Sequence, residues 1–234
     1  MTILAIEFSA PQRSVAVVQA NVQPPGAIGN WQSAIGNALS EVIETDARAA
    51  NALDMIEAAL RQAQVEREQV DCLAVGIGPG SYNGIRTAIA LAQGWHLAGG
   101  QGGARLLGIS SAECVAAQAQ TEAIFGRVWV VMDAQRNEFY LAGYEVSEEG
   151  GRETEPLRLA TMADVQACEK AGGTIIGPEV TRWFPGGRLI FPRAATLGRL
   201  ALNRNDFVPG EKLEPIYLRQ TNFVKAPPPR VLPR

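Results

Sequence analysis

The residues of this sequence that could carry chemistry begin with a glycine-rich turn, GIGPGSYNGIR from Gly76 to Arg86, which lies between a short apolar run and a segment with helical periodicity. It matches neither the P-loop pattern, which needs Gly-Lys, nor the G-x-G-x-x-G pattern of dinucleotide-binding turns. Free backbone N–H groups at a helix start can still hold an anion, and polar side chains there can cap the helix. Two interpretations stay open: a tight structural turn, or a contact with an anion or a nucleotide. The residues of such a contact would be Gly78, Gly80, Ser81 and Asn83.

Two acidic residues, Glu7 and Asp133, each follow a short apolar run and precede a polar turn and a second apolar run. At the ends of equivalent strands they could face each other across a cleft and hold Mg²⁺, as acidic residues do in phosphoryl-transfer sites. The alternative is a pair of solvated acids at hairpin tips. We favour this alternative because no further ligand and no phosphate-binding lysine is visible, so the two acids form only a weak candidate Mg²⁺ site.

The sequence predicts no catalytic residue and no metal-ligand set. The single histidine, His96, excludes multi-histidine metal sites within one chain, and its place on an apolar helix face predicts a packed side chain rather than a catalytic base. The segment GISSA nearly matches the G-x-S-x-G pattern, but the histidine precedes Ser110, against the hydrolase order of serine, acid and histidine. We therefore expect Ser110 to cap a helix. The three cysteines are far apart and odd in number, which predicts reduced thiols.

The composition is that of a folded globular protein, with 234 residues, 47% hydrophobic and 19% charged. The net charge of -3 argues against a nucleic-acid binder that uses its whole surface, although a local basic patch stays open. The first residues lack the pattern of a signal peptide, and no apolar run reaches the roughly 18 residues of a membrane span. We expect a cytoplasmic protein that does not contact the membrane.

Hydrophobic periodicity predicts alternating strands and helices. The expected strands are 2–7, 14–19, 40–45, 73–76, 106–107, 127–133, 138–145, 174–176 and 188–191. The expected helices are 47–64, 85–99, one that starts at Ser110 and one that runs from Thr161 to about Gly172.

An internal similarity organises these elements, because the pattern of strand, acid, polar turn and strand around Glu7 occurs again around Asp133. Two such halves predict a duplicated α/β fold with two mixed sheets, joined near the glycines that follow Ala98. We expect the first half over residues 1–103 and the second over 104–224, with its last helix able to pack back on the first half. Residues 225–234, rich in Pro and Arg, are expected to form a flexible tail.

Several segments occur in the order of the motifs of one protein family. They are ILAIEFS from Ile3 with SVAV from Ser14, VGIGPGSYNGIR from Val75, LGISSAE from Leu107, MDAQRNEFY from Met132 and PIYLR from Pro215. Together they resemble the TsaB family, formerly called YeaZ, of tRNA threonylcarbamoyladenosine biosynthesis proteins, which is related to the Kae1/TsaD (Gcp) group.

The resemblance implies an actin/Hsp70-like, ribonuclease H-like duplicated fold. It also implies a non-catalytic partner subunit that is required for threonylcarbamoylation of adenosine 37 in tRNAs and that scaffolds a TsaD-like transferase with a TsaE-like ATPase. Such a subunit needs no cofactor and meets tRNA only through the complex. The alternative is a stand-alone ATP-dependent transferase or glycoprotease-type enzyme of the same superfold.

A partner surface is expected on two helices. The helix from Ile85 is apolar nearly all round, so that a sheet can cover only one side of it, and the helix from Ala47 carries a second patch of small apolar residues. We expect a helical-bundle interface with the TsaD-like partner, or a homodimer in its absence, on a surface that is exposed in the monomer. Its residues would be Met55, Ala58, Ala59, Ala88, Ala92 and Trp95.

Overall fold

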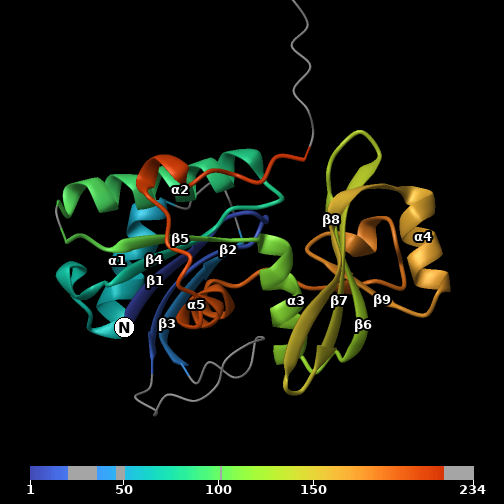
Figure 1. Ribbon diagram of the computed structural model, residues 1–234, viewed down its shortest axis with the longest axis horizontal. Coiled ribbons are helices and arrows are strands. Elements are labelled where there is room, and N and C mark those ends of the chain that lie inside the picture. Colours follow the sequence, from blue (N-terminus) through green and yellow to red (C-terminus); the bar gives the residue numbers. More distant parts are fainter. Residues whose placement is uncertain (21–35, 46–50, 101, 219–234) are drawn as a thin grey trace, which may run out of the picture.

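The computed structural model describes residues 1–20, 36–45, 51–100 and 102–218, which form two five-stranded sheets with helices on both faces of each (Figure 1). Residues 225–234 lie outside this description, so the flexibility expected for them stays a prediction. No helix in the described ranges is long and apolar enough to cross a membrane.

The first sheet has the strand order β3-β2-β1-β4-β5. Strand β2 pairs antiparallel with both β1 and β3. On the other side of β1, β4 and then β5 are added in parallel. The strands are β1 (Thr2–Glu7), β2 (Arg13–Ala20), β3 (Gly36–Glu44), β4 (Cys72–Gly76) and β5 (Arg105–Ile109). Every residue of β1 and β4 is buried, as expected for strands that are covered on both faces.

Alternate residues of β1 pack against different helices, because successive side chains of a strand point to opposite faces. Leu4 and Ile6 face α1 (Ala52–Ala63) and α2 (Tyr82–Ala98), and Ile3 and Ala5 face α5 (Ala194–Leu202). The first sheet is therefore a middle layer between two helical layers.

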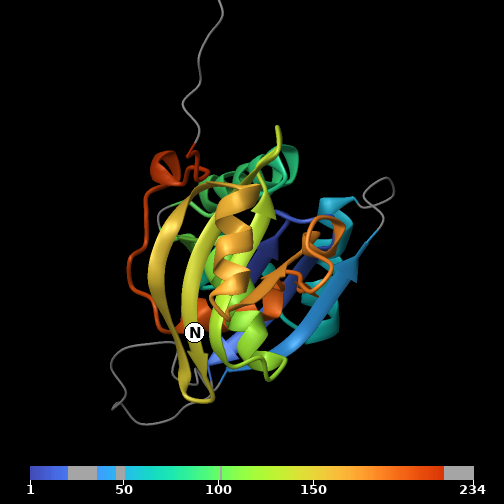
Figure 2. The same cartoon turned by 90° about the vertical axis from the view of Figure 1, so that its right-hand side faces the viewer.

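The second sheet repeats this plan with the strand order β10-β9-β6-β7-β8. Its strands are β6 (Gly126–Asp133), β7 (Glu138–Ser147), β8 (Gly150–Thr161), β9 (Thr174–Gly177) and β10 (Arg188–Leu189). One face packs on α3 (Ser111–Thr121), and the other is covered by α4 (Met162–Lys170), which lies across the sheet in Figure 2. The duplicated α/β fold with two mixed sheets is confirmed.

The two halves exchange their last helices. Helix α3 follows β5 of the first sheet but packs on β6, β7 and β8, whereas α5 follows β10 and packs on β1, β2 and β3. The two exchanged helices also contact each other between the sheets. Because β5 pairs with β4, the strand that starts at Arg105 completes the first sheet, although the expected division placed residues from 104 onward in the second half.

The burial of α1 contradicts the expected partner surface. Met55 is 1% exposed and lies in the core with Ile56, whereas Leu53 is 60% exposed. The helix begins at Ala52 after the capping residue Asn51, and it packs against β2 and β3. Of the six expected interface residues, four are buried, namely Met55, Ala59, Ala88 and Ala92, and two are half-buried, namely Ala58 and Trp95. The expectation that these residues are exposed in the monomer is therefore wrong for the four buried ones.

The different burial of Met55 and Leu53 predicts a large loss of stability for one alanine substitution on α1 and a small one for the other. Met55→Ala should lower the free energy of unfolding by about 2 to 5 kcal/mol, because it leaves a cavity in the core. Leu53→Ala should change it by no more than about 0.5 kcal/mol, because that side chain is already in water. Urea denaturation of both variants followed by circular dichroism measures the two values. A Met55→Ala protein that is as stable as the wild type would show that Met55 lies on the surface, as the sequence suggested.

Candidate functional site

A buried carboxylate lies where the first sheet meets α3. Glu7, the last residue of β1, is fully buried, so it is not the solvated hairpin-tip acid that we favoured from the sequence. Its Oε1 accepts a hydrogen bond from the Ser9 backbone N–H at 2.7 Å, and its Oε2 accepts one from the Ser111 hydroxyl at 3.0 Å. A Cβ at Gly76 would lie 2.0 Å from Oε2, so that only glycine fits at the end of β4. Glu7 therefore ties three separate segments together.

Ser111, the first residue of α3, completes this contact. Its hydroxyl donates to Glu7 and accepts from the Gly78 N–H at 3.2 Å, and its own N–H donates to the Gly78 carbonyl at 2.8 Å. The neighbouring Ser110 occupies the N-cap position but makes no capping hydrogen bond with its side chain, so the expected capping role of Ser110 is wrong. Residue type alone could not distinguish the two serines, because the choice depends on where Glu7 lies.

The glycine-rich turn packs tightly against the first hairpin. The Ser81 N–H donates to the Ser9 carbonyl at 2.7 Å, and a Cβ at Gly80 would lie 2.2 Å from that same oxygen. A Cβ at Gly84 would lie 2.0 Å from the Phe8 carbonyl oxygen. Close approach of two backbones thus accounts for these glycines.

The four residues proposed for an anion contact have different surroundings. The N–H groups of Gly78 and Ser81 are used within the protein, and the Ser81 hydroxyl caps α2 by accepting from the Gly84 N–H at 3.3 Å. Gly80 lies against the hairpin, and Asn83 is exposed in the first turn of α2. The internal hydrogen bonds favour the structural interpretation of this turn.

Asp133 has the equivalent place at the end of β6 but different neighbours. It is partly exposed, and its Oδ1 accepts a hydrogen bond from the Gln135 N–H at 2.7 Å, which starts a turn of three left-handed residues. Among the described residues, no three His, Cys, Asp or Glu side chains come close enough to hold a metal ion. A Mg²⁺ site at Glu7 and Asp133 would need ligands from outside this part of the chain.

Burial controls the chemistry of the Glu7 carboxyl and the Cys114 thiol. Desolvation raises the pKa of the Glu7 carboxyl, although the hydrogen bonds from Ser9 and Ser111 act in the opposite direction. Burial also raises the pKa of the Cys114 thiol, and the nearby Glu7 adds to this effect. Both groups are therefore poor nucleophiles. His96 is half-buried, and its Nδ1 lies 2.9 Å from the Ala104 carbonyl oxygen, as a packed structural histidine would.

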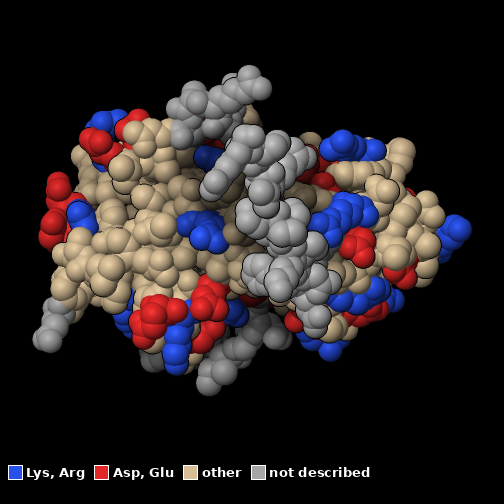
Figure 3. Space-filling model, turned by 90° about the horizontal axis from the view of Figure 1, so that it is seen from above, with Lys and Arg blue, Asp and Glu red and all other residues tan. Residues whose placement is uncertain are grey.

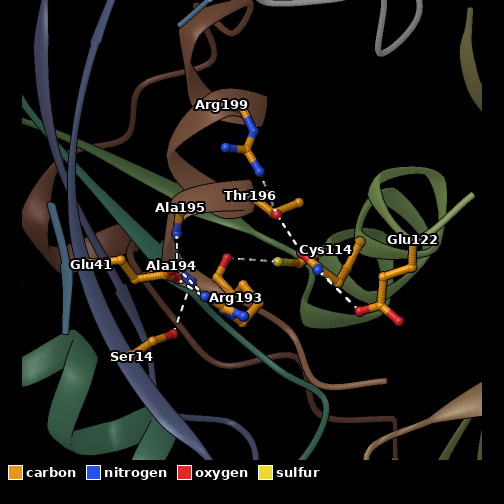
Figure 4. A network of polar contacts seen from close by, with 10 residues as sticks. Ser14, Glu41, Cys114, Glu122, Arg193, Ala194, Ala195, Thr196 and Arg199 are labelled. Atoms are coloured by element: carbon orange, nitrogen blue, oxygen red, sulfur yellow. Dashed lines mark hydrogen bonds and ion pairs between the residues drawn. The ribbon is translucent and has the colours of Figure 1, made fainter. Parts of the chain in front are cut away.

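A second polar network fixes the start of α5 against the first sheet (Figure 4). The Arg193 guanidinium pairs with both carboxylate oxygens of Glu41 on β3, and Glu41 also accepts from the Ala195 N–H at 3.0 Å. The Ala194 N–H donates to the Ser14 hydroxyl on β2 at 2.8 Å. These partners satisfy backbone N–H groups at the helix start that would otherwise be free.

The same network reaches α3. The Cys114 thiol donates to the Arg193 carbonyl at 3.4 Å, and the Thr196 hydroxyl donates to the Gln118 side-chain oxygen at 2.6 Å (Figure 4). The two exchanged helices are thus joined by buried hydrogen bonds as well as by packing. No sequence motif indicated this network, because its members come from four separate elements.

Comparison with known proteins gives the family. The sequence profile of the family described as "TsaD: tRNA N6-adenosine threonylcarbamoyltransferase" matches residues 43–208, more than two thirds of the chain. The chain belongs to this family. The Escherichia coli (strain K12) protein named "tRNA threonylcarbamoyladenosine biosynthesis protein TsaB" is 27% identical over 238 residues, which cover 94% of this chain and 95% of that protein. The TsaB (YeaZ) resemblance stated from the sequence motifs is confirmed.

Solved structures agree on the fold. A Pseudomonas aeruginosa structure described as an uncharacterized protein with similarity to peptidase YEAZ has a TM-score of 0.71 and 25% identity, and covers 93% of this chain and 99% of that chain. A second, "YeaZ from Pseudomonas aeruginosa", has a TM-score of 0.73 and 24% identity with the same coverage. The actin-like duplicated fold is confirmed.

The buried carboxylate predicts a pH dependence of stability. In the unfolded chain Glu7 ionises near its ordinary pKa of 4.5, whereas burial raises this pKa in the folded protein. The folded state therefore holds the proton over a wider pH range, so that the stabilisation is full below pH 4.5 and is lost as the pH rises through the raised pKa. Glu7→Gln, which stays neutral, should raise the free energy of unfolding at pH 7 to 8, with a difference that shrinks toward pH 4.

Urea denaturation across this pH range measures the effect. The control is Glu57→Gln on the exposed side of α1, which should follow the wild-type profile. A Glu7→Gln protein that is less stable than the wild type at every pH would show that the junction needs a charged carboxylate.

Proposed function

We propose that this protein is a non-catalytic partner subunit in the threonylcarbamoylation of adenosine 37 of tRNA, and that it works in the cytoplasm with a TsaD-like transferase and a TsaE-like ATPase. The observation that carries the proposal is the similarity to TsaB over 94% of the chain, since that relative is named for threonylcarbamoyladenosine biosynthesis. Family membership adds the connection to the transferase group.

The geometry supports a subunit without its own chemistry. Both oxygens of Glu7, the acid at the end of β1, accept hydrogen bonds from the protein itself. The ring of His96 is engaged with the Ala104 carbonyl. The groups that would carry a reaction in this fold are thus used to hold the elements together, and the protein acts through its surface.

The partner surface is placed on the outward side of α2. The exposed residues in the middle of this helix carry no charge, and Leu97 is 78% exposed. A Cβ at Gly94 would meet nothing within 4 Å, so that another helix can approach closely there. Figure 3, seen from this side, shows a broad and mostly uncharged area, with a basic side chain near its middle and the other charged side chains around its margins. A second copy of this chain would use the same surface when the transferase is absent.

A reconstituted reaction tests whether the partners, and not this protein, catalyse the modification of tRNA. The purified protein, given tRNA, threonine, bicarbonate, ATP and a source of threonylcarbamoyl-AMP, should form no threonylcarbamoyladenosine, because the part of the chain that the structure describes holds no cluster of metal ligands. Addition of the TsaD-like and TsaE-like proteins should restore the product. Mass spectrometry of tRNA nucleosides measures it, and product formation by this protein alone would favour the stand-alone transferase instead.

A charge on α2 tests the surface. Leu97→Arg should abolish association, because burial of an unpaired charge costs on the order of several kcal/mol. The melting temperature should stay unchanged, since Leu97 is 78% exposed. Leu189→Arg on the second sheet, where the leucine is 50% exposed, is the matched control. Light scattering and partner pull-down report association, and full binding by Leu97→Arg would exclude this side of α2.

A further inference from the structure

Four exposed residues of α2 share one side of the helix, because they follow one another at spacings of four, four and three. They are Arg86, Ala90, Gly94 and Leu97, which we call the α2 stripe. At a rise of 1.5 Å per residue, Arg86 lies about 16 Å along the helix from Leu97. The α2 stripe therefore has a cation at one end, two small residues in its middle and an exposed leucine at the other end.

The guanidinium of Arg86 is held in place by two tyrosines. Its Nη1 donates to the Tyr82 hydroxyl at 2.7 Å, and its central carbon lies 5.1 Å from the centre of that ring. Contact with the Tyr217 hydroxyl is the largest of the effects that raise the pKa of Arg86. Tyr217 is held in turn, because the neighbouring Ile216 N–H donates to the Ile77 carbonyl at 2.9 Å. A side chain that is already positioned loses less entropy on binding.

No carboxylate of the described residues pairs with this cation. The ion pairs in that part of the chain are made by other arginines, and none includes Arg86. Within α2 it is the only charged residue, with His96 counted as neutral. A guanidinium carries five N–H donors in a fixed fork that matches a carboxylate, and the tyrosine hydroxyls do not neutralise its charge.

The middle of the α2 stripe lets another helix come close to Arg86. A Cβ at Gly94 would meet nothing within 4 Å, and packed helices lie about 8 to 10 Å apart. A charge that such a helix encloses without a partner costs affinity, so that a tight complex requires an opposite charge beside Arg86. A single cation on an uncharged stripe fits one protein carboxylate, whereas binding of a nucleic acid takes several positive charges.

We propose that Arg86 selects the protein that binds α2, because it pairs with a carboxylate of the TsaD-like transferase and finds none on α2 of a second copy. The 17 residues of α2 contain no Asp and no Glu. Two α2 helices packed against each other would therefore leave both Arg86 charges unpaired, which disfavours the homodimer. The inference rests on the proposed function, which names both occupants of this surface.

The test uses the full chain and compares the two complexes. Arg86→Gln should weaken binding of the TsaD-like protein about tenfold or more in isothermal titration calorimetry, because the partner carboxylate loses its counter-charge. The same variant should tighten the homodimer about threefold or more in light scattering over a dilution series, because the unpaired charge is removed. Opposite changes in the two complexes cannot arise from a loss of folding.

The matched control is Arg182→Gln. Arg182 is exposed, as Arg86 is, and its guanidinium carbon lies 5.2 Å from the Trp183 ring beside the second sheet. This variant should form both complexes as the wild type does. Thermal melting of each variant checks that the fold is intact.

Charge reversal identifies the partner group. Arg86→Glu should lose the TsaD-like protein, and lysine in place of one surface acid of that protein should restore binding to the variant. Tyr82→Phe keeps the ring but removes the hydroxyl that positions Arg86, so it should weaken the heterodimer by about threefold. Failure of every lysine substitution to restore binding would contradict the inference.

The inference is also overturned if Arg86→Gln binds the TsaD-like protein as the wild type does, or if it weakens both complexes equally. Loss of binding by Leu97→Arg in the same titrations would then show that the surface on α2 stands and that only the selection by Arg86 is refuted. Product formation by this protein alone is scored in a separate reaction, so that a failure of the proposed function is recognised apart from these titrations.

Discussion

The structure depends on one buried carboxylate. Burial of Glu7 is costly, and the cost is reduced, though not cancelled, by the hydrogen bonds that the Ser9 N–H and the Ser111 hydroxyl donate to its two oxygens, while Gly76 leaves room for the side chain. These three partners belong to the first hairpin, to α3 and to β4, so that satisfying one acid fixes the relative positions of three segments. Removal of any partner would leave a buried polar group unpaired, which is why the junction is rigid.

The exchange of α3 and α5 follows from the same junction. Ser111 anchors the start of α3 at the carboxyl end of β1, and the rest of that helix extends onto the second sheet. Helix α5 makes the reverse crossing and is anchored at its start by Glu41 and Ser14. Each sheet is therefore covered by a helix from the other half. The hydrogen bond from Thr196 to Gln118 joins α5 to α3. Neither half has a complete core without the other.

Sequence periodicity predicted the two hairpins, the glycine turn and the duplication, because these depend on local alternation and on turn residues. It missed β8, whose residues GGRETEPLRLAT form an edge strand that is buried mainly at its ends and shows no apolar alternation. It also assigned Met55 to the exposed side of α1, because apolar residues occur on more than one side of that helix; Met55 is buried, whereas Leu53 is exposed. The burial of Glu7 could not be predicted, because Ser111 and Gly76, which enclose its side chain, lie far away along the chain.

Polar groups that are hydrogen-bonded within the protein are not available to a ligand or a partner. In the described part of the chain, the acid of the first hairpin, the serine of α3 and the N–H groups of the glycine turn are largely committed to internal hydrogen bonds. What is left to a partner is the surface. The middle of α2 is uncharged and ends at the exposed Leu97, which suits the approach of another helix. The turn before α2 is bound to the first hairpin through the Ser81 N–H and the Ser9 carbonyl, and to α3 through Gly78 and Ser111. Because Ser111 also binds Glu7, the helix would be presented to a partner from the same junction that buries the acid.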